Sequence, residues 1–234
     1  MKRGGILSVF IILLTEITGY SSSLSSVKET RDVSGFTKVS FGVSGNLYIN
    51  LGNEFKVVLE GESSLLENIV TEVTNGNLII KMKNWRLSLN EKVTVNITMP
   101  AIRDLGVSGS GKVEIVNGLS TDDLSLSVSG SGKLITSNIE ATIMKCSISG
   151  SGDIILGGKG KISEADLSIS GSGNYTGEDA ELGTAEISIS GSGDCSCNVT
   201  SSLRVRISGS GNVFYDGNPK VDARISGSGK VRSK

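Results

Sequence analysis

The sequence contains no histidine, and only 4% of its 234 residues are aromatic. Without histidine the protein lacks the commonest general base, the Ser/His and Cys/His nucleophile pairs, and the usual zinc and iron ligand sets. Only chemistry based on Asp, Glu, Lys or Tyr remains. A core with few aromatic side chains is usually built by stacking many similar units of Val, Ile and Leu, and the 31 glycines indicate frequent tight bends.

The net charge is also small, and long apolar segments are absent from the sequence. The formal net charge is −1, which argues against a nucleic-acid partner. The apolar run from Ile6 to Leu14 is too short to span a bilayer, which needs about 20 residues. Because Lys2 and Arg3 precede this run and small residues follow it, we interpret residues 1–22 as a secretory signal peptide, with an uncleaved membrane anchor as the alternative.

This interpretation predicts where the mature chain resides. After signal cleavage it would have no membrane span and would be extracytoplasmic, in the periplasm, at the cell surface or secreted. No cysteine follows the apolar run, so the sequence does not predict a lipoprotein.

The most repeated feature of the chain is the motif SGSG, which always follows Val or Ile. Its copies come after Val107, Val128, Ile148, Ile169, Ile189, Ile207 and Ile225. Their spacings of 21, 20, 21, 20, 18 and 18 residues are typical of one coil of a solenoid. An alternation of apolar and polar residues leads into the motif, as in DLSLSVSGSG, which favours a structural corner after a strand over a flexible linker.

Alignment of the copies places apolar residues in three columns, with mostly polar residues between them. The columns are Leu105, Leu126, Cys146, Leu167, Ile187, Val205 and Ala223; Val107, Val128, Ile148, Ile169, Ile189, Ile207 and Ile225; and Val113, Leu134, Ile154, Tyr175, Cys195, Val213 and Val231. We therefore predict an all-β fold, a right-handed single-stranded parallel β-helix (β-solenoid) with about 18–21 residues per coil. Strand parity predicts that both glycines of each SGSG point inward and both serines outward.

The predicted β-helical domain covers residues 32–234. Residues 101–234 form the regular SGSG coils, and residues 32–100 form irregular N-terminal coils or a cap continuous with them. In the irregular part, VSGN at Val43 is a shortened copy of the motif, and Asn75-Gly76 predicts a hairpin turn. Residues 62–70 predict a short helix with Ser64 as a candidate N-cap.

Two outward-facing sets of residues are candidates for binding. A ladder of motif serines could hold a glycan or another extended polymer, or could consist of small polar residues that suit a solvated bend. The residue after each motif forms a second ladder, in which Asp153, Asn174 and Asp194 could approach a calcium ion. Three ligands in a straight ladder are too few for a closed cage, so we predict mixed charges on a solvated face and no metal site. The ladders are Ser108, Ser129, Ser149, Ser170, Ser190, Ser208 and Ser226, and Lys112, Lys133, Asp153, Asn174, Asp194, Asn212 and Lys230.

The three cysteines, Cys146, Cys195 and Cys197, fall in inward columns. We interpret them as buried free thiols, with a CxC metal pair or a disulfide as alternatives. The acidic residues are dispersed, and we recognise no pair of carboxylates in adjacent coils beside a basic residue. Trp85 and the pair Phe214-Tyr215 are too isolated for a sugar-stacking platform. We therefore predict no catalytic residue, no cofactor site and no enzyme activity.

Several segments of the chain resemble a known family. FTKVSFGVSGNLYI, NLIIKMK and VTVNITMPAIRDLGVSGSG, followed by the tandem coils and GNVFYDGNPKVDARISGSGKV, are similar to the head GIN domain of putative auto-transporter adhesins. The resemblance extends from about Phe36 to Val231. It implies a β-helical fold and a surface or adhesive role in exported proteins common in Bacteroidetes-like bacteria. It supplies no catalytic residues.

The sequence thus predicts a non-enzymatic exported cell-envelope protein, an adhesin or structural β-solenoid module. The alternatives are a carbohydrate-active β-helix enzyme and a periplasmic scaffold or sensor partner. No C-terminal membrane barrel follows the last coil, so we expect that the chain does not secrete itself as an auto-transporter does. The expected partner is an envelope glycan or a surface protein. The positive surplus in residues 204–234 is interpreted first as edge protection and second as a docking surface for an acidic partner, and an open β-helix end favours homo-oligomers.

Overall fold

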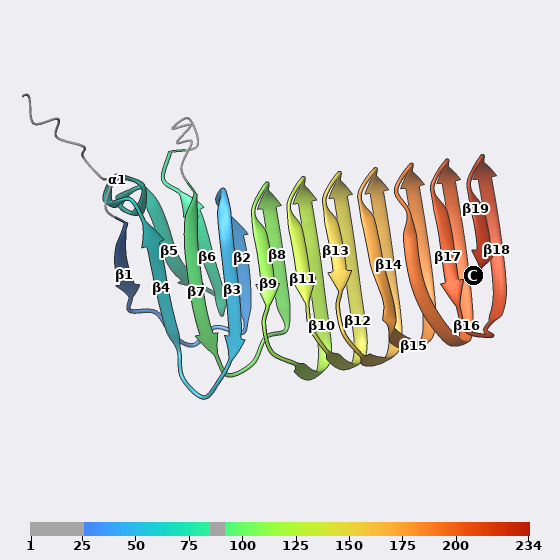
Figure 1. Ribbon diagram of the computed structural model, residues 1–234, viewed down its shortest axis with the longest axis horizontal. Helices are drawn as coiled ribbons and strands as arrows, with labels where there is room; N and C mark the ends of the chain where they lie inside the picture. Colours follow the sequence, from blue (N-terminus) through green and yellow to red (C-terminus); the bar gives the residue numbers. More distant parts are fainter. Residues whose placement is uncertain (1–25, 85–91) are drawn as a thin grey trace, which may run out of the picture.

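The structure is a computed structural model that describes residues 26–84 and 92–234. Within these residues the chain forms a β-solenoid whose coils stack along one axis (Figure 1), which confirms the predicted fold class. The regular coils contain β8 (Asp104–Gly109), β9 (Lys112–Ile115), β10 (Leu119–Gly130), β11 (Lys133–Thr136), β12 (Ile139–Gly150), β13 (Asp153–Leu156), β14 (Gly160–Gly171), β15 (Asn174–Gly191), β16 (Cys195–Gly209), β17 (Asn212–Asp216), β18 (Lys220–Gly227) and β19 (Lys230–Ser233).

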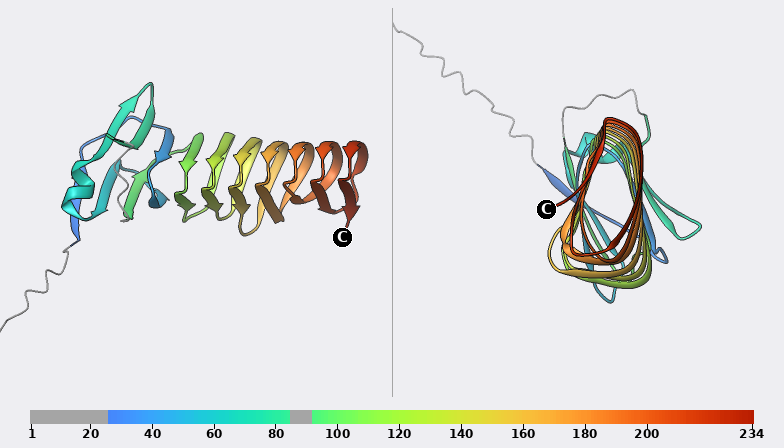
Figure 2. Two further views of the ribbon diagram at one scale, coloured as in Figure 1. Left: turned by 90° about the horizontal axis from the view of Figure 1, so that it is seen from above. Right: turned by 90° about the vertical axis from the view of Figure 1, so that its right-hand side faces the viewer.

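The coils build two facing sheets of parallel strands. The first sheet runs from β8 through β10, β12, β14, β15 and β16 to β18. The second runs from β9 through β11, β13, β15 and β16 to β17 and β19. The long strands β15 and β16 contribute to both sheets. Seen along the axis, the regular coils superimpose as a flattened oval (Figure 2).

The register stacks each motif residue on its counterpart in the next coil, from Val107 opposite Val128 to Ile207 opposite Ile225. The coils therefore have the predicted lengths of 18–21 residues. The step to 18 residues coincides with an irregularity in β15, where the register with β16 jumps between Gly177 and Glu181.

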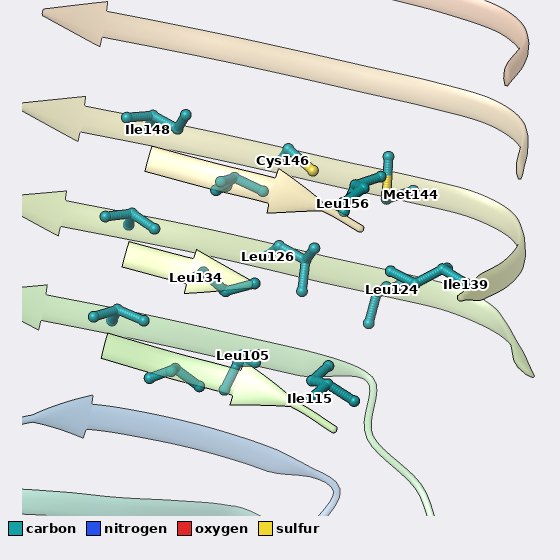
Figure 3. Close-up of a cluster of buried hydrophobic side chains, with 14 of the residues drawn as sticks. Leu105, Ile115, Leu124, Leu126, Leu134, Ile139, Met144, Cys146, Ile148 and Leu156 are labelled. Atoms are coloured by element: carbon teal, nitrogen blue, oxygen red, sulfur yellow. The ribbon is translucent and has the colours of Figure 1, made fainter. Parts of the chain in front are cut away.

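The core lies between the two sheets, and the three apolar columns predicted from the sequence supply part of it, while buried residues outside them, such as Ile115, Leu124 and Leu156, complete it. Leu105, Leu126 and Cys146 stack on the first sheet, opposite side chains such as Ile115 and Leu134 of the second (Figure 3). Burial of each Ile or Leu contributes about 1.5–3 kcal/mol. The columns are buried up to β16 and β17, but Ile225 is 44% exposed on the edge strand β18.

The N-terminal region extends both sheets. It contains β1 (Val27–Arg31), β2 (Lys38–Gly42), β3 (Gly45–Leu51), β4 (Lys56–Gly61), α1 (Ser63–Glu67), β5 (Ile69–Thr74), β6 (Asn77–Met82) and β7 (Val93–Met99). β2 lies between β6 and β8, and β3 lies between β7 and β9, all in parallel. The first coil in the sequence is therefore not the first in space. Antiparallel strands β5, β4 and β1 then end the two sheets.

Local signals in this region have mixed outcomes. The predicted hairpin between β5 and β6 is confirmed, because Asn75 and Gly76 have φ of 52° and 71°, as a type I′ turn requires. The predicted helix is shorter than expected, since β5 already begins at Ile69, and its N-cap is Glu62 rather than Ser64. Residues 69–74 form strand β5 and pair with β6, so Ile69 and Val70, which were expected in the helix, are not part of it.

Candidate functional site: the serine groove

The two glycines of each motif build the corner in different ways. The first has positive φ, from 89° at Gly109 to 132° at Gly209, and it is half-buried or exposed. The second is buried in every copy up to Gly211, and a Cβ on Gly173 would lie 2.1 Å from the Gly152 carbonyl oxygen. The prediction that both glycines point inward is correct for the second and wrong for the first, because the bend after the strand requires a left-handed residue there.

This corner presents two outward columns on the first sheet. The motif column contains the exposed serines Ser108, Ser129, Ser149, Ser170, Ser190, Ser208 and Ser226. The preceding column, two residues earlier in each strand, contains Gly106, Ser127, Ser147, Ser168, Ser188, Arg206 and Arg224. Because the strands are parallel and in register, both columns run straight along the solenoid.

A groove of about 460 Å³ lies between these columns over β14, β15, β16 and β18. We call it the serine groove. Its lining consists of Ser168, Ser188, Arg206 and Arg224 from the preceding column, Ser170, Ser190, Ser208 and Ser226 from the motif column, and the residues between them, Ile169, Ile189, Ile207 and Ile225. Ile169, Ile189 and Ile207 are only 2–3% exposed, whereas Ile225 is 44% exposed, and the lining as a whole is more apolar than polar.

The hydroxyl groups of the groove are unpartnered. Within the described parts of the chain, none of its six serines forms a hydrogen bond through its side chain. Each hydroxyl can donate one hydrogen bond and accept two. The groove therefore offers a regular array of donors and acceptors to solvent or to a ligand, and this observation supports the polymer-binding interpretation of the serine ladder.

Two arginines extend the preceding column beyond its serines. The Arg206 guanidinium donates a hydrogen bond to Glu186 Oε1, and Arg204 Nη1 lies 3.5 Å from Glu186 Oε2. The hydrogen bond from Arg206 holds the pKa of Glu186 below its usual value, so this carboxylate stays ionised. Arg224 is exposed and has no hydrogen bond or ion pair within the described residues.

The second ladder, formed by the residue after each motif, lies on the second sheet, and several of its members are hydrogen-bonded to one another. Asn174 Nδ2 donates to Asp153 Oδ1 at 3.2 Å, and the Asp194 amide donates to Asn174 Oδ1 at 3.0 Å. Asn212 donates to Asp194 Oδ1 from both its amide and its side chain, and Lys133 pairs with Asp153 at 3.3 Å. The candidate calcium ligands thus satisfy one another, and no group of three or more Cys, Asp or Glu among the described residues is arranged to hold a metal ion.

One expectation about the acidic residues is wrong. The register places Asp166 and Glu186 side by side in adjacent coils, with Lys145 and Arg204 on either side. These residues line a second groove of about 370 Å³. The alignment of the motif copies already puts both carboxylates three residues before the motif isoleucine, at Ile169 and Ile189, so the pair could have been recognised from the sequence.

All three cysteines are free and buried, as predicted. Cys146, Cys195 and Cys197 lie near the fully buried Tyr175, and burial raises the pKa of Tyr175 well above its ordinary value. Burial likewise raises the pKa of the Cys146 thiol. Tyr175 and Cys146 therefore remain protonated, and they act as core side chains rather than as members of a site.

Tyr175→Phe is expected to leave stability unchanged or to raise it by about 1 kcal/mol. The Tyr175 hydroxyl is buried and has no hydrogen-bond partner in the part of the chain that the structure describes, and an unpaired buried polar group is costly. Urea unfolding measures the change, with Tyr175→Leu as the comparison that also removes ring packing. A clear loss of stability in Tyr175→Phe would mean that the hydroxyl is bonded after all.

The remaining candidates do not join a site. Trp85 and the predicted signal peptide, residues 1–22, lie outside the described residues. Phe214 lines a pocket on the second sheet together with Asp153, Asn174 and Asp194 of the second ladder. Tyr215 is half-buried against the core. In the described ranges, 26–84 and 92–234, no helix has the length and apolar character needed to cross a bilayer.

The arginine end of the groove was missed as part of a site. The sequence shows the basic surplus in residues 204–234, which we interpret first as edge protection and second as a docking surface for an acidic partner or an anionic envelope polymer. The available signal is the change from serine to arginine at a fixed position of the repeat, at Arg206 and Arg224. Only the stacking shows that these arginines share a groove with serines of earlier coils.

Comparison with solved structures identifies close relatives of the fold. A putative adhesin from Bacteroides fragilis matches with a TM-score of 0.84 and 24% identity, covering 91% of this chain and 98% of its own. A putative adhesin from Parabacteroides distasonis matches with a TM-score of 0.75 and 20% identity, over 91% and 98%. A structure titled putative lipid binding protein, also from Parabacteroides distasonis, matches with a TM-score of 0.71 and 22% identity, over 89% and 96%. No curated protein matches the chain.

The solved structures show a shared fold, and a family model assigns the chain to a family. It matches residues 35–219, which include the N-terminal coils and most SGSG copies. Since this span is well over half of the sequence, the chain belongs to the family described as putative auto-transporter adhesin, head GIN domain.

Proposed function

We propose that the protein is a non-enzymatic, exported module of the cell envelope that binds an extended glycan along the serine groove. The observation that carries this proposal is the straight array of unpartnered hydroxyls in a groove on the first sheet. Coils in fixed register hold these groups at the strand spacing of about 4.8 Å, so a polymer would meet the same chemistry at every step.

Two further observations support this role. The family and two of the structural neighbours carry the name adhesin, and Lys2, Arg3 and the apolar run that follows have the features of an export signal. Another neighbour is named for lipid binding. The lining of the groove is more apolar than polar, and Ile225 is 44% exposed, but its two rows of serine hydroxyls favour a hydroxyl-rich glycan.

Ser190→Tyr is expected to weaken glycan binding by about tenfold or more, because the ring would fill the middle of the groove. A glycan array and titration calorimetry on the full chain measure the affinity. Ser129→Tyr is the matched control: it makes the same change in the same exposed column but outside the groove lining. Equal binding by wild type and Ser190→Tyr, or residence of the chain in the cytoplasm on fractionation, would contradict the proposal.

The carboxylate pair favours one second candidate function, a carbohydrate-active enzyme. Asp166 and Glu186, flanked by Lys145 and Arg204, resemble the mixture of acidic and basic groups that polysaccharide-cleaving sites use. The low pKa of Glu186 disfavours it as a general acid. Release of new chain ends from a polysaccharide, lost in Asp166→Asn, would favour this candidate; binding without cleavage would favour the adhesive module.

A further inference from the structure

We infer that the ligand of the serine groove is an acidic glycan, whose carboxylate, sulfate or phosphate group pairs with Arg224. This inference rests on the proposed function and specifies the class of ligand and the polarity of the site. It starts from the charges that line the groove. Arg206 and Arg224 contribute two positive charges, and none of the other lining residues is charged.

The two arginines are not equivalent. Arg206 already donates to Glu186, so part of its charge is neutralised within the protein. Arg224 has no partner within the described residues, and its planar guanidinium can bind a carboxylate, sulfate or phosphate through two parallel hydrogen bonds. Of the neighbouring acidic residues, Asp222 lies 3.9 Å from Arg204 and does not line the groove. Arg224 is therefore the cation of the groove that remains available to an anion.

The rest of the groove fits a sugar chain better than another anionic ligand. Serine hydroxyls on both walls can exchange hydrogen bonds with sugar hydroxyls. The lining is more apolar than polar, with Ile225 44% exposed, so vesicles of an anionic lipid are included in the test as the competing ligand. A polymer lying along the solenoid would contact the serines of β14 and β15 at one end of the groove and the arginines of β16 and β18 at the other end.

The test compares acidic oligosaccharides with their neutral counterparts on the full chain. Oligogalacturonate, a glucuronate-containing chain and a phosphate-bearing glycan are each titrated beside the methyl-esterified, reduced or dephosphorylated form. Each acidic form that binds is expected to bind about tenfold or more tightly than its neutral counterpart, since a hydrogen bond to a charged group is worth about 1.5–3 kcal/mol. Added salt is expected to narrow the difference.

Arg224→Gln is expected to abolish the preference for the acidic form, and Arg224→Lys to restore part of it. Arg232→Gln is the matched control, because Arg232 is an exposed arginine of β19 that lies outside the groove lining. Equal affinity for acidic and neutral forms, or equal effects of Arg224→Gln and Arg232→Gln, would overturn the inference.

The outcomes separate this inference from the proposed function. Binding of neutral glycans that is sensitive to Ser190→Tyr but not to Arg224→Gln would leave the glycan-binding module standing and reject the acidic ligand. Binding to phosphatidylglycerol vesicles with no binding to any glycan would reject both. Binding of acidic glycans that Ser190→Tyr does not weaken would place the site outside the serine groove and also reject both.

Discussion

Gly171→Val is expected to lower the free energy of unfolding by about 3 kcal/mol or more. Gly171 has a φ of 123°, and a Cβ on it would lie 2.3 Å from the Gly150 carbonyl oxygen of the coil below. A β-branched residue in such a conformation costs about 1–3 kcal/mol. The clash adds a similar amount, because backbone held by neighbouring strands cannot move aside. Thermal and urea unfolding followed by circular dichroism measure the loss.

Ser172→Val is the control for this substitution. Ser172 is the next residue, it is exposed at the bend, and it lies outside the positive φ region. Its amide donates to the Gly150 carbonyl at 2.8 Å, a bond that the substitution retains. We expect a change within about 0.5 kcal/mol for Ser172→Val. Similar melting temperatures for the two variants would refute the explanation of the corner.

Ile187→Ala is expected to cost about 2–5 kcal/mol. Ile187 is fully buried, and the register stacks it between Leu167 and Val205. Truncation leaves a cavity between two rigid sheets that cannot close onto it. Urea unfolding measures the cost, and Ser188→Ala, at the neighbouring outward position, is expected to be nearly neutral.

The position of the damage is a second readout for Ile187→Ala. In a solenoid each coil contacts only its neighbours, so amide exchange is expected to accelerate most in β14, β15 and β16. Protection of β2 and β3, several coils away, should change least. Uniform acceleration throughout the chain would show instead that the solenoid unfolds as a single unit.

The regular coils were largely predictable because the same local pattern of residues recurs in each of them. Alternation along DLSLSVSGSG fixes which residues point inward, and a constant motif fixes which residues stack. The buried columns and the buried thiols followed from this pattern. Val43-Ser44-Gly45 was also recognisable as a shortened motif, and the structure stacks it against the corner of β8 and β9, where the Ser44 and Ser110 hydroxyls lie 3.3 Å apart.

The candidate site was less predictable because its parts come from different coils. The serine ladder and the pair of Asp166 and Glu186 can be read from the aligned motif copies, but the groove and the free cation at Arg224 cannot. Each depends on which side chains meet across strands that are 18–21 residues apart. Small differences in coil length shift these neighbours by one or two positions, and one position moves a side chain to the other face.

The sequence by itself determined that the chain is a solenoid, how long each coil is and which three columns of side chains are buried in it, since these follow from strand alternation and the repeat. Only the tertiary structure decided that β2 and β3 lie between β8–β9 and the later β6–β7, and that the two motif glycines serve different purposes. The physical reason is that such features arise from backbone contacts between coils. Their energies depend on packing in three dimensions and leave no periodic trace along the chain.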